Sequence, residues 1–339
     1  MKYILFILLI LTVFTLPVRA ASTEKQVGVH AYLQFRGTSD LRSEGEFFLR
    51  RLKVWVHSTP GFSRHWSFKI QTTFTSLHKE KFFLQDVKLN YRWKRFSLDM
   101  GQFVPAFSLQ RSQHDYQIAP IERARVVNVL IPDGTLGVRD LGFQLNYGTR
   151  KSRFRTQTGV FNGYGIKDYR PHNNGLMIAH RTQWMFSLPS AGKVLLGYSL
   201  QYRWAEDLPL YFILPDSVRF TGKDVRTNLF GEWKWHQVDL QAEVIRANLE
   251  GQVAYGYYLL CVLSYQRSQW VFSGETYHDL IDNTPDVPMY RLGYNYLLDD
   301  NRIRLSLDNR FGIEHHHVSN YRITVQLQFF LSPEGSHTG

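Results

Sequence analysis

The chain has 339 residues, of which 44% are hydrophobic, and its formal net charge at pH 7 is +11. No stretch after the first twenty residues approaches the roughly 18 uninterrupted apolar residues that a membrane-spanning helix requires, which excludes a helical membrane protein. The single cysteine, Cys261, excludes a fold held by its own disulfides.

The first twenty residues combine a basic start at Lys2, an apolar run over residues 3–16 and a small-residue exit at Ala20. This pattern predicts a secretory signal peptide over residues 1–20. The positive charge of the chain points to acidic partners, and export argues against nucleic acid, which leaves lipopolysaccharide and small anions. No linker interrupts the rest, so we expect one domain over residues 21–331, followed by a polar C-terminal tail over residues 332–339.

Apolar and polar residues alternate strictly over residues 26–36, where Val27, Val29 and Leu33 lie on one face and Gln34 and Arg36 on the other. About ten residues of period two can cross an outer membrane as a tilted strand. Similar runs recur over residues 46–57, 66–74, 83–93, 96–101, 139–147, 153–161, 176–186, 194–204, 225–235, 238–245, 252–265, 270–278, 288–297, 302–310 and 321–330. The predicted fold is all-β, a transmembrane antiparallel β-barrel of about sixteen strands.

The connections between these runs alternate in length. Short turns follow the even runs and longer loops follow most odd runs, as expected for periplasmic turns opposite external loops. Aromatic residues such as Trp93, Trp184 and Trp270 gather at the short-turn ends and predict an interfacial girdle. The longest loops are residues 102–138 and 205–224. We expect the first of these, the third outer loop, to fold into the lumen, because so long a loop in a compact domain needs a functional explanation.

Two places resist the alternation. Arg50 falls on the lipid-facing side of the second run, which suggests a position near the outer interface or a slip in register. Residues 255–263 are apolar on both faces, so they could pack inward against a plug or loop, or outward against another subunit.

Basic residues outnumber acidic ones on the polar faces of the strands by roughly two to one, which predicts an anion-preferring lumen. The predicted channel-lining and anion-binding residues are Arg36, Arg51, Lys53, Lys69, Lys88, Arg92, Arg155, Arg181, Arg203, Arg226, Arg304 and Arg322 on strands, and Arg111, Arg123 and Arg125 in the loop. The acidic residues on the same faces are Asp86, Asp99, Glu232, Asp239, Glu243, Glu275 and Asp308. We expect Glu122 and Asp140 to fix the loop. In the alternative interpretation, the charges pair across strands and only keep the lumen wet.

Other site chemistry is weakly indicated. His315, His316 and His317 alternate in direction along a strand and favour a solvated outer loop over a metal site. No nucleophile motif occurs, so we expect neither an enzyme nor a cofactor.

Several motifs resemble the phosphate-selective porin O and P family. Gly101–Phe103 opens a GQF-x-P-x-F-S-L-x-R segment that ends at Arg111, residues 121–123 read I-E-R, residues 139–145 read R-D-x-G-F-Q-L and residues 160–163 read V-F-N-G. Residues 48–53 resemble the family's arginine-bearing second strand, and the resemblance runs from about residue 26 to 331. Two features depart from the family pattern: the insert at residues 133–138, and the polar tail that follows the aromatic end of the last strand.

The resemblance implies an outer-membrane porin of the Gram-negative type, a passive diffusion channel for small hydrophilic solutes with preference for phosphate-like anions. It also implies a homotrimer. The expected partners are therefore small anions, the lipid bilayer and lipopolysaccharide. Two alternatives stay open, namely a nonselective porin and a barrel with an adhesion or assembly role whose lumen is blocked.

Overall fold

The computed structural model describes residues 26–42, 45–76, 81–131, 138–149, 151–166, 176–281, 286–299, 301–314 and 317–331. The predicted signal peptide, the polar tail, most of the 133–138 insert, and His315 and His316 lie outside these residues. Within the described ranges, no helix has the length and apolar character to span a membrane.

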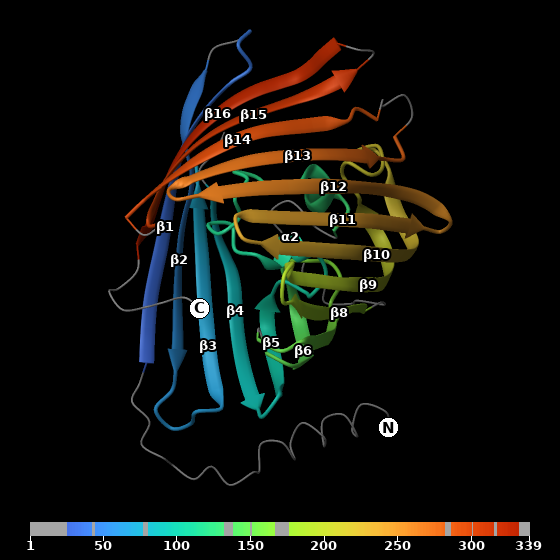
Figure 1. The fold of residues 1–339 in the computed structure, drawn as a ribbon. Coiled ribbons are helices and arrows are strands. Elements are labelled where there is room, and N and C mark those ends of the chain that lie inside the picture. Colours follow the sequence, from blue (N-terminus) through green and yellow to red (C-terminus); the bar gives the residue numbers. More distant parts are fainter. Residues whose placement is uncertain are drawn as a thin grey trace.

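Sixteen antiparallel strands close into one barrel, in which every strand pairs with its neighbours in the chain (Figure 1). The strands are β1 (Gln26–Ser39), β2 (Glu46–Thr59), β3 (Trp66–Thr75), β4 (Lys81–Trp93), β5 (Phe96–Phe103), β6 (Asp140–Tyr147), β7 (Phe154–Phe161), β8 (Met177–Leu188), β9 (Gly192–Pro209), β10 (Arg219–Trp235), β11 (Val238–Leu249), β12 (Gln252–Tyr265), β13 (Ser268–His278), β14 (Met289–Leu298), β15 (Ile303–Glu314) and β16 (His317–Leu331). β1 and β16 complete the ring, with Leu33 opposite Phe329. Because closure leaves no open edge, the backbone groups of the wall are satisfied, and the predicted fold class is confirmed.

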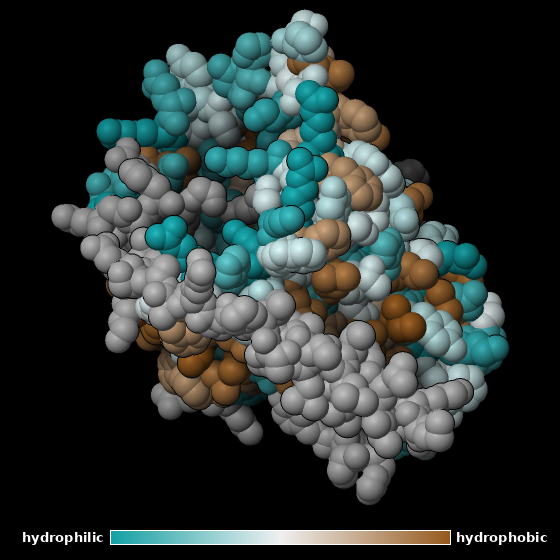
Figure 2. All heavy atoms as spheres, turned by 90° about the horizontal axis from the view of Figure 1, so that it is seen from below, coloured by the Kyte–Doolittle hydropathy of each residue, from teal (hydrophilic) through white to brown (hydrophobic). Residues whose placement is uncertain are grey.

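The alternation along each strand sorts residues between lipid and lumen. On β1, Val29 and Phe35 are exposed on the outside, while Tyr32, Gln34 and Arg36 are buried inside. An apolar outer band around a polar interior is the arrangement of a transmembrane barrel. Seen from below the view of Figure 1, the described part of the surface shows hydrophilic regions interspersed with groups of hydrophobic residues (Figure 2).

β9 and β10 extend farther than the sequence predicted. The expected loop over residues 205–224 is wrong, because Arg219 pairs with Pro209 and Phe220 with Leu208, which leaves only residues 210–218 as the connection. The pairing register shifts between Phe220 and Gly222, and Gly222 has a φ of +144°. Such a β-bulge breaks the strict alternation, so the extension could not be recognised from period two.

Arg50 also owes its direction to a bulge. Arg51 pairs with Gln34 and Leu49 pairs with Phe35, so Arg50 is the extra residue on β2. Its side chain turns into the lumen and meets Glu122. The slip in register considered from the sequence is therefore the correct interpretation, and no arginine faces lipid at this point.

The third outer loop leaves β5 and enters the barrel, where it forms α2 (Leu109–Ser112) and α3 (Arg125–Val129), as Figure 1 shows for α2. Loop residues such as Phe107 and Val126 share one buried core with Tyr258 and Leu260 of β12. The two apolar faces of residues 255–263 are thereby explained: one faces lipid and the other packs against the loop. The predicted inward folding is confirmed.

A second outer connection adds to this core. Leu210, Ile213 and Leu214 are buried in the same cluster, and the backbone N–H of Leu280 donates a hydrogen bond of 2.9 Å to the carbonyl of Ile213. Apolar packing therefore occupies the lumen along β9–β13.

The contact between α3 and the wall can be tested by a substitution at Gly256. A Cβ on Gly256 would lie 2.6 Å from the carbonyl oxygen of Thr276 and 2.7 Å from a Val126 methyl, whereas a Cβ on Gly274 would meet Tyr290 at 3.5 Å. We expect Gly256→Ala to lower the free energy of unfolding in lipid vesicles by about 1–3 kcal/mol through overpacking. Gly274→Ala is the control, and an equal effect of the two substitutions would contradict this packing.

Candidate functional site

A polar cavity of about 790 Å³ remains in the lumen, between the loop and the inner faces of β1–β13. The charged side chains that line it are Arg50, Arg51, Lys53, Lys69, Asp86, Lys88, Asp99, Arg111, Asp115, Arg123, Arg139, Arg155, Arg181, Glu232, Lys234 and Asp239. The cavity is therefore the part of the barrel in which a dissolved ion would meet charged groups.

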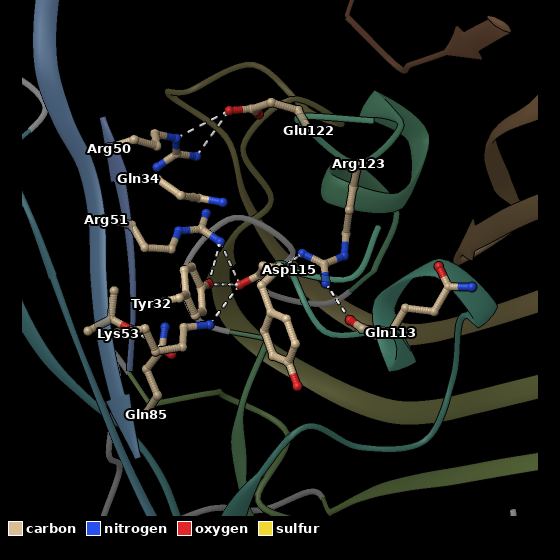
Figure 3. A network of polar contacts seen from close by, with 12 residues as sticks. Tyr32, Gln34, Arg50, Arg51, Lys53, Gln85, Gln113, Asp115, Glu122 and Arg123 are labelled. Atoms are coloured by element: carbon tan, nitrogen blue, oxygen red, sulfur yellow. Dashed lines mark hydrogen bonds and ion pairs between the residues drawn. The ribbon is translucent and has the colours of Figure 1, made fainter. Parts of the chain in front are cut away.

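Asp115 is the centre of the contact between loop and wall (Figure 3). Its carboxylate lies 2.6 Å from Arg51 Nη1 and 2.7 Å from Lys53 Nζ, both on β2, and it also pairs with Arg123 of the loop. The Tyr32 hydroxyl donates to the same carboxylate at 3.3 Å. Burial opposes ionisation of Asp115, but the three neighbouring cations outweigh it and hold its pKa well below the usual range.

Glu122 makes a second contact of the same kind. It pairs with Arg50 at 3.2 Å and with Arg36, and these two cations overcome the effect of burial and lower its pKa. Arginines of β14 and β15 serve the loop backbone: Arg304 donates to the carbonyl of Ile118 at 2.7 Å, and Arg291 donates to that of Glu122. Carbonyls buried inside the barrel would be costly without such donors.

The loop is anchored on the opposite wall by Glu243 of β11. This buried carboxylate accepts hydrogen bonds from Ser108 Oγ at 2.9 Å and from the backbone N–H groups of Leu109 and Gln110 at 2.9 and 2.8 Å. Tyr258 donates a further hydrogen bond at 2.8 Å. Glu243, which was counted as a lumenal charge, is thus occupied by the start of α2.

The other predicted loop-fixing residue, Asp140, lies at the start of β6 and not in the contact between loop and wall. Its Oδ2 accepts the backbone N–H of Gly163 at 2.6 Å, so it joins the end of β7 to the end of the loop. Beside it, Arg139 and Lys69 each lie 2.8 Å from the Asp86 carboxylate. The C-terminal end of the loop is therefore tied to β4 and to the segment that follows β7.

The predicted channel-lining residues divide into two groups. Arg51, Lys53, Lys69, Lys88, Arg111, Arg123, Arg155 and Arg181 line the cavity. Arg36, Arg92, Arg125, Arg203, Arg226, Arg304 and Arg322 do not line it.

The residues of the second group do not reach the cavity. The alternation along a strand predicts which side chains point inward, but it does not predict whether a loop covers them. Arg203 and Arg226 share the buried Asp224, and Arg226 also donates to the carbonyl of Leu130. Arg125 is exposed, with its guanidinium 5.3 Å from the ring centre of Tyr277. Arg226 therefore holds the loop, whereas Arg203 also donates to the carbonyl of Gly163 and Arg125 belongs to the loop itself.

Asp115 and Arg50 were not among the predicted site residues. Asp115 lies in a loop, to which no parity applies, and its presence in a loop predicted to enter a basic lumen is the one signal that could have identified it. Arg50 was assigned to the wrong face because of the bulge.

Basic groups exceed acidic ones in these contacts. Three carboxylates, those of Asp86, Asp115 and Glu122, are shared by seven basic side chains, namely Arg36, Arg50, Arg51, Lys53, Lys69, Arg123 and Arg139. Lys88 and Asp99, 3.4 Å apart, form a simple pair. In the part of the chain that the structure describes, no group of three or more His, Cys, Asp or Glu is placed to hold a metal ion.

The central role of Asp115 can be tested by removing its charge. We expect Asp115→Asn to lower the free energy of unfolding by about 3–5 kcal/mol, because it leaves three buried cations without their carboxylate. Asp207→Asn is the matched control: Asp207 pairs with Arg219 at the surface, with side chains 62% and 48% exposed. The control should cost no more than about 1 kcal/mol. Similar losses in chemical denaturation of the two variants would refute the role of Asp115.

The lowered pKa values of Asp115 and Glu122 predict a pH dependence. A carboxylate whose pKa is lower in the folded than in the unfolded state stabilises the fold fully above its unfolded pKa of about 4, and this stabilisation is lost as the pH falls toward the folded value. We therefore expect the free energy of unfolding to be steady from neutral pH to about pH 5 and to fall below it. The slope should be smaller in Asp115→Asn than in the parent chain, and equal slopes would show that other groups dominate.

Comparisons with known proteins agree with this architecture. The chain is similar in fold to loop-deleted OmpT of Vibrio cholerae (TM-score 0.62, 9% identity, covering 91% of this chain and 100% of that one). It is also similar to OprB of Pseudomonas putida (TM-score 0.63, 11% identity, covering 91% of this chain and 94% of that one). A third similar structure is an anion-selective porin from Comamonas acidovorans (TM-score 0.64, 9% identity, covering 91% of this chain and 100% of that one). No curated protein sequence matches it. A family model matches residues 26–206, more than half of the chain, so the protein belongs to the phosphate-selective porin O and P family.

Proposed function

We propose that this porin works as a passive outer-membrane channel for small hydrophilic solutes and that it prefers anions of the phosphate type. The observation that carries the proposal is the sharing of carboxylates: Asp86 and Asp115, which line the cavity, and Glu122, which pairs with the lining Arg50, each bind two or three cations. Charge pairing therefore does not cancel the basic character of the lumen. Positive charge in a water-filled passage with low-dielectric walls attracts anions.

Arginine is prominent among these cations, and its planar fork of donors suits phosphate and carboxylate better than a point charge does. One structural neighbour is an anion-selective porin, which is compatible with the same preference. We further propose export by the signal peptide over residues 1–20, contact with lipopolysaccharide, which the positive net charge of the chain favours, and assembly as a homotrimer. OmpT of Vibrio cholerae, another neighbour in fold, is known in a trimer form.

A barrel with a blocked lumen is the second candidate. It is favoured by the apolar core of Phe107, Leu210 and Ile213, which fills the lumen along β9–β13. The channel is preferred because the polar cavity of about 790 Å³ lies beside this core and is lined by charged side chains.

The anion preference predicts the sign of a reversal potential. With purified protein in a planar bilayer under a KCl gradient near 0.1 M, we expect chloride to be more permeant than potassium. The preference should weaken at 1 M salt, since the Debye length falls from about 10 Å to about 3 Å. Lys69→Gln with Lys88→Gln should move the reversal potential toward zero, because two cations that line the cavity are lost.

The control is Arg219→Gln, which also removes a positive charge, but from an exposed ion pair outside this cavity. A cation-selective sign would refute the proposal. A value near zero would favour a nonselective porin, and the absence of conductance would favour the blocked barrel.

A further inference from the structure

We infer that the outer rim of the barrel binds an anionic phospholipid at the short turns β4–β5 and β6–β7. The phosphodiester headgroup of the lipid lies against Lys94, Arg95, Lys151 and Arg153, and its acyl chains lie against the aromatic residues beside them. The short turns of an outer-membrane barrel face the periplasm, so the lipid belongs to the periplasmic leaflet. The site is outside the lumen and separate from the proposed passage of solutes.

The rim with the short turns is strongly basic. Its described connections are residues 60–65, 94–95, 148–149, 151–153, 189–191, 236–237, 266–267, 299 and 301–302. Asp299 is the one acidic residue among them. The basic residues of the same connections are all exposed, namely Arg64, Lys94, Arg95, Lys151, Arg153, Arg267 and Arg302. Four of these seven cations lie in the turns β4–β5 and β6–β7. Positive charge concentrated in this way attracts anionic headgroups.

The two turns belong to adjacent hairpins of the wall. β5 pairs with β6, with Phe96 opposite Tyr147 (Figure 1). The backbone N–H of Gly148 donates a hydrogen bond of 2.8 Å to the carbonyl of Arg95 and thereby joins one turn to the other. The two turns therefore present their four cations on the same stretch of the rim.

The four cations are available to a ligand. Among the residues that the structure describes, no carboxylate forms an ion pair with them, since the acidic residues of β4–β7, Asp86, Asp99 and Asp140, are buried inside the barrel. Lys94 Nζ lies 5.6 Å from the ring centre of Trp93. A cation–π contact orients the ammonium group without neutralising its charge, so the group can still bind a phosphate.

A row of aromatic side chains runs beside these cations. The ring centres lie 6.2 Å apart between Trp93 and Phe96, 5.1 Å apart between Phe96 and Tyr147, and 6.1 Å apart between Tyr147 and Phe154. Aromatic rings of this kind lie between the hydrocarbon and the headgroups of a bilayer. Long basic side chains next to them reach the depth of the phosphates. A phospholipid fits both the apolar and the ionic part of this surface, whereas a soluble acidic protein would leave the aromatic row without a partner.

The test uses the porin isolated from the outer membrane and counts bound lipids by native mass spectrometry during titration with phosphatidylglycerol or phosphatidylcholine. We expect phosphatidylglycerol to bind at least about tenfold more tightly. Lys94→Asn with Arg95→Gln should raise its dissociation constant at least about tenfold, because each basic residue beside an anionic headgroup strengthens binding about fivefold. Asparagine suits position 94, where φ is +52°. Lys151→Gln with Arg153→Gln should have a similar effect.

The matched control is Lys193→Gln with Arg267→Gln, which removes two exposed cations from other parts of the same rim. An equal loss of affinity in this control would refute the site, because the overall charge of the rim would then account for binding. Equal affinities of the parent porin for the two lipids would also refute it. Unchanged lipid affinity together with a reversal potential shifted toward zero would refute the site and assign these cations to solute passage. The reversal potential of the parent porin tests the proposed anion preference independently of all these outcomes.

Discussion

The architecture of the lumen depends on arginine side chains of the wall that donate hydrogen bonds to the loop inside the barrel. A loop that enters a barrel brings backbone carbonyls away from bulk water, and each needs a donor. Arg226, Arg291 and Arg304 donate to the carbonyls of Leu130, Glu122 and Ile118 from three different strands. The long reach and several donors of arginine suit this task. The first role of these basic side chains of the wall is therefore to hold the loop in position, and any role toward a solute is secondary.

Anchors on opposite walls give the loop one position. Glu243 on β11 holds the start of α2, and the cations of β2 hold Asp115. Apolar packing of α3 against β12 supports the loop between these points. The open cavity lies beside the loop and is lined by loop residues and by inward side chains of the wall from β1 to β13. The shape of the open passage thus depends on where carboxylates and cations of the wall bind the loop.

The sequence predicted the sixteen strands because alternation with period two directly reports which residues face lipid. It predicted the inward loop from the length of residues 102–138. It could not predict which inward arginines reach water. Arg181 and Arg203 share the same parity and similar burial, yet only Arg181 lines the cavity, whereas Arg203 pairs with Asp224 of the neighbouring strand. Such contacts join residues that are far apart in the chain. Bulges at Arg50 and Gly222 hid two further features, since one extra residue exchanges the faces of a strand.

The sharing of one carboxylate among several cations makes the site tolerate change unevenly. If Arg51 is replaced in the course of evolution, Asp115 keeps Lys53 and Arg123 as partners, so the loop remains attached. If Asp115 is replaced, all three cations lose their carboxylate together. The basic positions can therefore drift and compensate for one another, and the substitutions among them will be non-additive. Natural variation in solute preference can therefore arise by substitution of the basic residues. Asp115 is the position at which a substitution disturbs the contact between loop and wall most.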